Sequence, residues 1–161
     1  MNKWKEIIPY IIIIVVVLLV RTYIVSPIRV TGTSMEPTLK EGEIMFLNKT
    51  CDINRYDIVV VDSSVEGDNI IKRVIGMPGD SIEVIDGKLY INDILTEDVY
   101  GSGETGDFNK VYLGSDEYYV MGDNRMVSLD SRVFGKIKRK TIKGVADFIV
   151  YPFNKFGKYD D

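Results

Sequence analysis

The chain has 161 residues, of which 45% are hydrophobic and 27% charged, and its formal net charge is −4. This composition excludes a disordered chain and a polytopic membrane protein. It also gives no support to nucleic-acid binding, which usually needs a basic face. The length predicts one globular domain in addition to whatever the N-terminal segment forms.

Two counts restrict the chemistry further, because the sequence has no His and its only Cys is Cys51. A Ser-His-Asp site, a Cys-His site and a zinc site built from Cys and His are therefore excluded, and an intrachain disulfide with them. Cys51 is more typical of an inert thiol than of a nucleophile. A general base near neutral pH must then be a carboxylate or a lysine with a lowered pKa. We expect no metal and no cofactor.

An almost continuous apolar run, residues 7–25, stands near the N-terminus. About 19 helical residues reach roughly 28 Å, close to the thickness of the hydrocarbon core, so the run predicts a transmembrane anchor. A cleaved secretory signal is the alternative, since Lys3 and Lys5 precede the run, but no A-x-A-like site follows it. The retained anchor is the interpretation that we adopt.

The chain then divides into a short cytoplasmic tail (residues 1–6), the anchor and an extracytoplasmic domain (residues 26–161). Lys3 and Lys5 favour a cytoplasmic N-terminus, although Arg21 and Arg29 on the other flank weaken that signal. We expect a single-pass protein of the cell membrane.

After residue 26 the pattern changes to short β-type runs separated by turn residues. No later window repeats with a helical period, so we predict a mostly β, antiparallel domain with one helical anchor. The stretch from Tyr100 to Gly114 is predicted to be a flexible loop. Its GSGETG segment matches a dinucleotide-binding pattern, but no apolar helix follows it. The expected strands are Glu43–Asn48, Asp57–Asp62, Ile70–Gly76, Ser81–Ile85, Lys88–Asn92, Glu117–Gly122 and Val145–Tyr151.

Two stretches hold a candidate nucleophile and a candidate base. In TGTSMEPTL (residues 31–39), Gly32 and Pro37 constrain the backbone near Ser34, which gives its Oγ the defined direction that a nucleophile needs. In IIKRVIGMPGD (residues 70–80), Lys72 and Arg73 point to opposite faces of a strand, and we expect at most one of them to be buried. A buried Lys72 could accept a proton from a Ser. The alternatives are a polar linking turn and two snorkelling cations.

A third stretch, GDNRMVSLDSRVFG (residues 122–135), packs charges among short polar side chains. Such a cluster is typical of a solvated loop, or of a hydrogen-bonded brace that positions a nearby site. Its charged residues are Asp123, Arg125, Asp130 and Arg132.

Together, the apolar run and the motifs SMEPTL, KRVIGMPGD and GDNR..S.DSR.FG resemble the bacterial type I signal peptidases, which are membrane-anchored Ser-Lys proteases. The resemblance covers nearly the whole chain and implies a fold of coiled antiparallel β-sheets. It implies that Ser34 is the nucleophile and Lys72 the general base. Ser128 then helps to orient the lysine, and Asp130 and Arg132 form a structural ion pair.

Two features depart from the family pattern. The backbone N–H of Ser34 is the implied oxyanion donor, but Gly32 stands where some members have a Ser whose hydroxyl is a second donor. Met126 and Val127 replace the more polar residues common between GDNR and the Ser. The short spacing between the second and third motifs resembles the minimal form of the family, without the extra domain of larger members.

The implied activity is endoproteolytic removal of signal peptides from preproteins after a small-x-small site, through an acyl-enzyme. Substrates are expected to bind extended beside a strand, and Val30, Met35 and Ile71 are candidates to line shallow apolar pockets. The expected partners are signal peptides and the lipid bilayer. The stretch Phe148–Phe156 is either a lipid contact or a core strand ending at a Pro turn.

Two other functions remain open. A soluble Ser-Lys self-cleaving repressor would have a DNA-binding domain where this chain has its apolar run. A non-catalytic anchored β-module is disfavoured by the presence of both Ser34 and Lys72, but Met126 and Val127 leave it in consideration.

Overall fold

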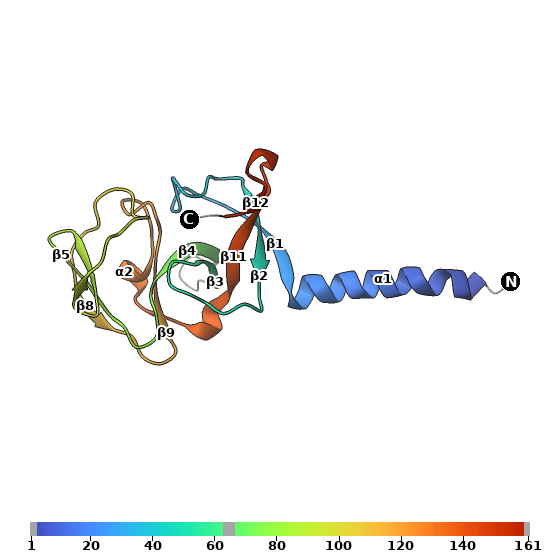
Figure 1. Cartoon of the computed structure of the whole chain (residues 1–161), viewed down its shortest axis with the longest axis horizontal. Helices are drawn as coiled ribbons and strands as arrows, with labels where there is room; N and C mark the ends of the chain where they lie inside the picture. The colour runs from blue at the N-terminus through green and yellow to red at the C-terminus, as the bar shows by residue number, and fades with distance from the viewer. Residues whose placement is uncertain (1–2, 63–66, 160–161) are drawn as a thin grey trace.

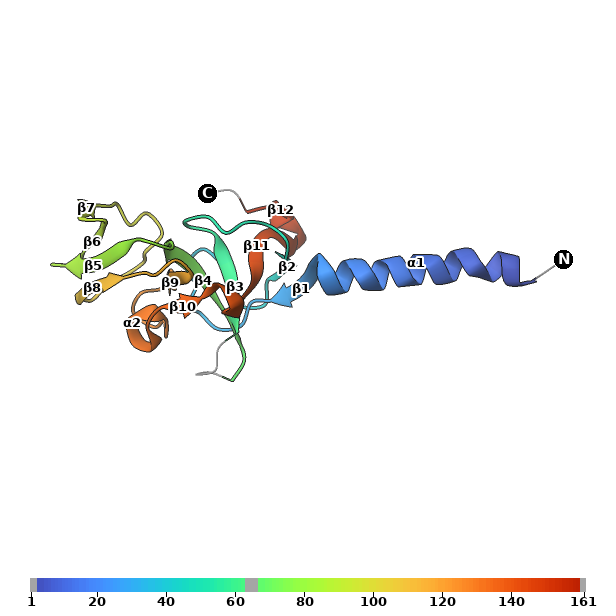
Figure 2. The same ribbon diagram turned by 90° about the horizontal axis from the view of Figure 1, so that it is seen from below.

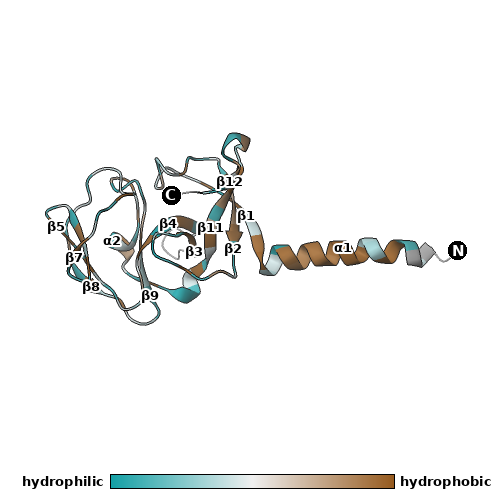
Figure 3. Cartoon of the chain, viewed as in Figure 1, coloured by the Kyte–Doolittle hydropathy of each residue, from teal (hydrophilic) through white to brown (hydrophobic). Residues whose placement is uncertain are grey.

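A long N-terminal helix, α1 (Lys3–Tyr23), projects from a β-rich domain (Figure 1). The computed structural model describes residues 3–62 and 67–159. Within α1, the segment Glu6–Tyr23 has a mean hydropathy of 2.1 and none of it is buried against the protein. Figure 3 shows that hydrophobic residues, in brown, follow one another along most of this helix. A helix satisfies its own backbone hydrogen bonds, so a run rich in Ile and Val is compatible with a membrane span.

The helix begins and ends earlier than the expected segment, residues 7–25. Val25 already belongs to a strand, because it pairs with Asn48. Residues 1 and 2 of the expected tail lie outside the described part of the chain, as do the side chains of Lys3 and Lys5 that favoured a cytoplasmic N-terminus.

The larger of two antiparallel sheets has eight strands. Seven follow one another in the order β1-β2-β11-β3-β4-β9-β10, and β12 pairs with β11. The sheet therefore places β4 between β3, which precedes it directly in the chain, and β9, which follows it about 40 residues later. The bounds are β1 Val25–Arg29, β2 Ile44–Asn48, β3 Ile58–Asp62, β4 Asn69–Gly76, β9 Glu117–Met121, β10 Ile137–Lys138, β11 Ile142–Tyr151 and β12 Gly157–Lys158.

A four-stranded sheet in the order β7-β6-β5-β8 forms the end of the domain farthest from α1 (Figure 2). Its strands are β5 (Ser81–Ile85), β6 (Lys88–Ile91), β7 (Ile94–Leu95) and β8 (Phe108–Tyr112). Short helical segments complete the described chain: α2 (Ser131–Phe134), η1 (Arg139–Thr141) and η2 (Phe153–Lys155). The mostly β, antiparallel fold predicted from the sequence is confirmed.

The seven expected strands are present, with ends that differ by up to three residues. The prediction of one long loop from Tyr100 to Gly114 is wrong in its second half, where β8 pairs with β5. The short helix α2 was also missed, because it is one turn long and depends on its cap. The Asp130 side chain accepts a hydrogen bond from the Arg132 N–H at that helix start.

Strand β3 lies at the centre of the core because both of its faces are covered. Ile58 and Val60 pack in one hydrophobic cluster, with Leu39 and Met45. Val59 and Val61 pack in another, on the opposite face. This two-sided burial explains the continuous apolar run in β3 and provides a rigid neighbour for β4, which pairs with it along its length.

Gly144 marks a place where two backbones approach closely. It lies at a register shift between β11 and β3, and a Cβ on it would stand 2.3 Å from the carbonyl oxygen of Asn48. We expect Gly144→Ala to lower the free energy of unfolding by about 1–3 kcal/mol, because backbone must move to admit the methyl group. Gly106→Ala is the matched control, since a Cβ there meets nothing within 4 Å. Urea unfolding followed by circular dichroism checks this, and equal effects of the two substitutions would contradict it.

Candidate active site

Ser34 and Lys72 are in direct contact, although 38 residues separate them in sequence. The Lys72 Nζ donates a hydrogen bond to the Ser34 Oγ at 2.8 Å. Lys72 comes from β4 and only 3% of it is exposed, whereas Ser34 lies half-buried in the turn that follows β1. A hydroxyl and an amine at this distance are positioned for proton transfer from one to the other.

The turn that holds Ser34 is anchored in the core on both of its sides. Met35 and Leu39 are buried, and the Leu39 N–H donates a hydrogen bond to the Met35 carbonyl at 2.9 Å. Gly32, before the serine, has a φ of +75°, a conformation that favours glycine. The direction of the Ser34 side chain is therefore set by buried neighbours rather than by the polar residues around it.

The expectation that at most one of the two adjacent cations is buried is wrong. Arg73 is fully buried as well, because a carboxylate from a distant part of the chain pairs with it. The guanidinium donates to both Asp123 oxygens, at 2.9 and 2.7 Å, and to the Tyr56 carbonyl at 2.8 Å. It also stacks on the Tyr100 ring, 3.8 Å from its centroid. Burial acts to lower the pKa of Arg73, but the hydrogen bonds and charge of Asp123 raise it above its ordinary value.

The third motif contacts the Ser34 turn directly through Asn124. Its backbone N–H donates to the Ser34 carbonyl at 3.0 Å, and its side-chain Nδ2 donates to the Thr33 carbonyl at 3.3 Å. Asp123, which pairs with Arg73, is the preceding residue. The motif thus links the turn of the candidate nucleophile to the strand of the candidate base.

Asp123, Arg125 and Asp130 of the third motif are buried and the Arg132 side chain is 15% exposed, so the alternative of a solvated loop is wrong. Asp130 accepts a hydrogen bond from the Gly122 N–H at 3.0 Å, and Arg132 donates to both of its oxygens, at 2.9 and 2.8 Å. Burial acts to raise the pKa of the Asp130 carboxyl, but these hydrogen bonds hold it below its ordinary value.

The GSGETG segment, predicted to be a flexible loop, folds around Arg125. This side chain donates to Asp98 at 2.9 Å and to the Thr105 hydroxyl at 3.3 Å. Burial, followed by the charge of Arg132, lowers the pKa of Arg125 to about 10. The Ser102 N–H also bonds to the Asp123 carbonyl at 2.7 Å. The segment thus packs against the third motif, and the dinucleotide-like spacing of its glycines coincides with a close approach of Gly101 to the guanidinium.

Ser128 lies beside the Ser34 carbonyl because Gly122 leaves room for it. A Cβ on Gly122 would stand 2.2 Å from the Ser128 Oγ and 2.5 Å from the Ser34 carbonyl oxygen. The Ser128 hydroxyl is buried, and its hydrogen bond to the Asp130 carboxyl helps to lower the pKa of that group. It is a polar group held close to the candidate nucleophile.

A cleft of about 240 Å³ opens over Ser34 and Lys72. Of the three residues expected to line a substrate pocket, Ile71 borders this cleft. Val30 and Met35 lie in the hydrophobic core beneath it, 2% and 1% exposed. Val127 and Leu129 were not expected to line the cleft, because their place there depends on how the third motif lies beside β4. The cleft is lined by Thr31, Gly32, Thr33, Ser34, Asn69, Ile70, Ile71, Lys72, Val127 and Leu129.

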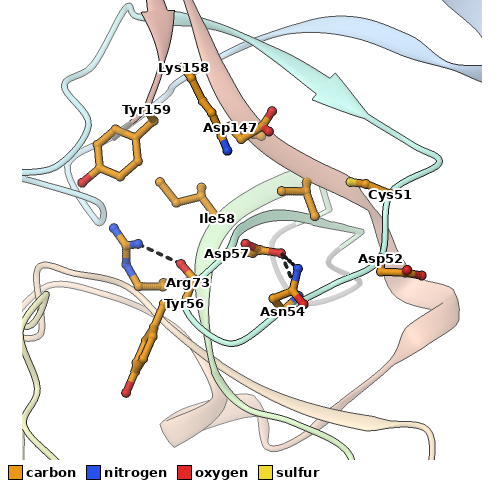
Figure 4. Close-up of a pocket in the computed structure, with 12 residues that line it drawn as sticks. Cys51, Asp52, Asn54, Tyr56, Asp57, Ile58, Arg73, Asp147, Lys158 and Tyr159 are labelled. Carbon is orange, nitrogen blue, oxygen red and sulfur yellow. Dashed lines mark hydrogen bonds between the residues drawn. The ribbon is translucent and has the colours of Figure 1, made fainter. Parts of the chain in front are cut away.

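A second cavity, of about 300 Å³, lies on the other side of β4 (Figure 4). Arg73 lines it, and neighbouring residues of a strand point to opposite faces, so Ser34 and Lys72 are not part of it. Figure 4 shows the Asn54 and Asp57 side chains paired at its edge and Tyr159 above Arg73. Cys51 lies at the rim, where burial raises the pKa of its thiol, as does the charge of Asp147, while backbone hydrogen bonds act in the opposite direction. The protonated thiol is a poor nucleophile.

Removal of the Asp123 carboxylate should unfold the domain more easily, because it leaves the Arg73 charge buried and unpaired. We expect Asp123→Ala to lower the free energy of unfolding by about 3–5 kcal/mol. The control is Asp62→Ala, whose carboxylate is 64% exposed and pairs with Lys143 at 3.2 Å, a type of pair worth at most about 1 kcal/mol. Urea titration of both variants tests the difference, and a similar loss in each would rule out a special role for the buried pair.

The depressed pKa of Asp130 should make part of the stability sensitive to acid. The contribution is complete above the unfolded carboxyl pKa of about 3.9 and is lost as the pH falls through the lower folded value. We therefore expect the difference in unfolding free energy between wild type and Asp130→Asn to narrow as the pH falls from 6 to 3, roughly the range over which an Asp titrates. Urea unfolding at stepped pH measures it, and a constant difference would contradict the assignment.

Comparison with known proteins identifies the family of the chain. The family model described as "Signal peptidase, peptidase S26" matches residues 3–151. The chain is 39% identical to a signal peptidase I of Bacillus licheniformis over 93% of this chain and 89% of that protein. It is 33% identical to a signal peptidase I of Streptococcus pneumoniae over 99% of this chain and 100% of that protein.

A crystal structure of a signal peptidase I from Enterococcus faecalis is also similar, at 32% sequence identity and a TM-score of 0.53. The match covers 59% of this chain and 97% of that one. The resemblance inferred from the three motifs is confirmed, and the chain belongs to the signal peptidase family of serine peptidases, peptidase S26.

Proposed function

We propose that this chain removes N-terminal signal peptides from exported preproteins, with Ser34 as nucleophile and Lys72 as general base. The observation that carries the proposal is the 2.8 Å contact between the Lys72 Nζ and the Ser34 Oγ. The chain has no His, and of the two remaining types of base, a carboxylate or a lysine, this contact favours the lysine. The contact also lies on the floor of a cleft that opens to solvent.

In the proposed reaction, a neutral Lys72 accepts the Ser34 proton as the Oγ attacks the carbonyl of the scissile peptide bond. The lysine then gives this proton to the leaving amine, and an acyl-enzyme remains. Water, deprotonated by the same amine, hydrolyses the ester and regenerates Ser34. The mechanism requires an uncharged lysine, and withdrawal of an amine from water, as in the buried position of Lys72, is an effect that favours the uncharged form.

The developing oxyanion needs a donor, and we assign this role to the backbone N–H of Ser34. Gly32 contributes no side-chain donor. Ser128, whose buried hydroxyl is close to the Ser34 carbonyl, is the residue that we propose to orient Lys72. The cleft walls formed by Ile70, Ile71, Val127 and Leu129 are suited to small apolar side chains, which supports cleavage after a small-x-small site.

We propose that α1 spans the cell membrane once, with the N-terminus in the cytoplasm and the domain outside. The end of the helix is fastened to the domain, because Lys49 donates to the Thr22 carbonyl at 2.8 Å and Ser26 donates to the Arg21 carbonyl at 2.9 Å. Ser34 follows this junction closely in sequence, so the site stays near the point where α1 leaves the bilayer.

Aromatic residues around η2 support contact of the domain with lipid. Phe153 and Phe156 are 78% and 60% exposed. Phe156 packs edge-on against Phe148 of β11, whose ring lies beside Phe46 of β2. Figures 1 and 2 place β12, next to this cluster, on the side of the domain near α1. Exposed aromatic side chains at this level are typical of residues that rest in the membrane interface. The strand itself contributes Ile149 to the core, so the lipid contact that we propose concerns the exposed aromatic residues that follow it.

A preprotein with an Ala-x-Ala site, in detergent or liposomes, tests the dyad. Wild type should cut after the second Ala, and Ser34→Ala and Lys72→Ala should each lower the rate by about 10³-fold or more, since acylation needs the Ser34 hydroxyl and both steps need the Lys72 amine as base. Lys88→Ala, an exposed lysine in β6, is the control and should cleave normally. Gel analysis and mass spectrometry of the products report the result.

Cleavage at an undiminished rate by Lys72→Ala would rule out the mechanism in which Lys72 is the general base. A wild-type protein that binds several preproteins and cuts none, with binding unchanged in Ser34→Ala, would favour the non-catalytic anchored module instead.

A further inference from the structure

Another hollow, separate from the cleft over Ser34 and from the cavity beside Arg73, is lined by residues of the Ser34 turn. It has a volume of about 440 Å³ and is lined by Glu36, Pro37, Lys40, Ser102 and Asn124. We refer to these five residues as the outer groove. Glu36 and Lys40 each follow one of the two buried side chains that anchor the turn, Met35 and Leu39. Because Met35 and Leu39 point into the core, Glu36 and Lys40 are held on the outer side of the turn.

The same two segments of the chain line both the outer groove and the cleft over Ser34. The Ser34 turn supplies Thr33 and Ser34 to the cleft and Glu36 and Pro37 to the groove. The third motif supplies Val127 to the cleft and Asn124 to the groove. The Asn124 N–H bonds to the Ser34 carbonyl at 3.0 Å, so a lining residue of the groove is in direct contact with the candidate nucleophile.

The two hollows differ in chemistry. Ile70, Ile71, Val127 and Leu129 give the cleft apolar walls, whereas the outer groove presents a carboxylate, an ammonium group and two uncharged polar side chains. A polypeptide that is cut at Ser34 has to continue past the nucleophile on both sides of the bond. The small apolar residues before the bond fit the cleft, which leaves the groove for the residues after it.

We infer that the outer groove binds the first residues of the mature protein, in extended form, and that Glu36 and Lys40 set a preference for the charges of those residues. This inference rests on the proposed function. Lys40 attracts acidic residues after the cleavage site and Glu36 attracts basic ones. Reversal of the Glu36 charge should therefore shift the preference toward acidic residues, and reversal of the Lys40 charge should shift it toward basic residues.

The test compares two preproteins that are identical up to the cleaved bond and carry either two Glu or two Lys at the second and third positions after it. The readout is the ratio of kcat/KM for the acidic and the basic substrate, measured with the full-length enzyme in detergent. Relative to wild type, Glu36→Lys should raise this ratio and Lys40→Glu should lower it, each by about two- to five-fold, the effect of exposed charge pairs. Both shifts should shrink in 1 M salt, which screens such pairs. The ratio is independent of the folded fraction of each preparation.

Glu41→Lys is the matched control, because it makes the same change in net charge at an exposed position outside the outer groove. Its ratio should stay close to that of wild type. If it shifts as much as Glu36→Lys, or if neither groove variant shifts the ratio while wild type cleaves both substrates, the groove assignment is overturned and the proposed function stands. Failure of wild type to cleave any preprotein would overturn both.

Discussion

The ion pair between Arg73 and Asp123 is the contact on which the arrangement of the candidate site depends. Arg73 is the sequence neighbour of Lys72, and Asp123 is the neighbour of Asn124, which bonds to the Ser34 carbonyl. The contacts therefore form a closed ring: Ser34 to Lys72, along the chain to Arg73, across to Asp123, along the chain to Asn124, and back to Ser34. A shift of β4 relative to the third motif would break the ring at its ion pair before it separated the hydroxyl from the amine. Burial makes that pair costly to break, since an unpaired guanidinium in the core has no water to replace its partner.

The polar groups around this ion pair also join separate segments of the chain by hydrogen bonds. Asp130 holds the Gly122 N–H and Arg132, and Arg125 holds the loop that follows β7. Asp130 and Arg125 are buried and each is satisfied by more than one partner, which is the condition under which buried polar networks rigidify a site. The Ser128 hydroxyl belongs to the same network, because its hydrogen bond helps to lower the pKa of the Asp130 carboxyl.

Much of this fold was predictable because its strands follow simple patterns. β2 alternates buried and exposed residues, and β3 is apolar throughout because it is covered on both faces. The motifs also identified Ser34 and Lys72 as a pair before any geometry was known. The double burial of Lys72 and Arg73 was not predictable from their strand, because the partner of Arg73 lies 50 residues away. The positions of Val30 and Met35 depended on which side of the turn faces the core, and β8 was missed because its pairing with β5 spans a loop. In each of these cases, the deciding contact joins segments that are remote in sequence.

The closed ring of contacts has a consequence for biosynthesis. Ser34 and Lys72 are both made early, but the residues that align them, Asp123 and Asn124, emerge from the ribosome about 50 residues after Lys72. Once that segment has been synthesised and β9 has paired with β4, the Arg73–Asp123 pair and the bond from the Asn124 N–H to the Ser34 carbonyl close the ring. A nascent chain that ends before Asp123 therefore lacks two of the contacts that join the Ser34 turn to β4, and the order of residues along the chain delays assembly of the candidate site until the domain is nearly complete.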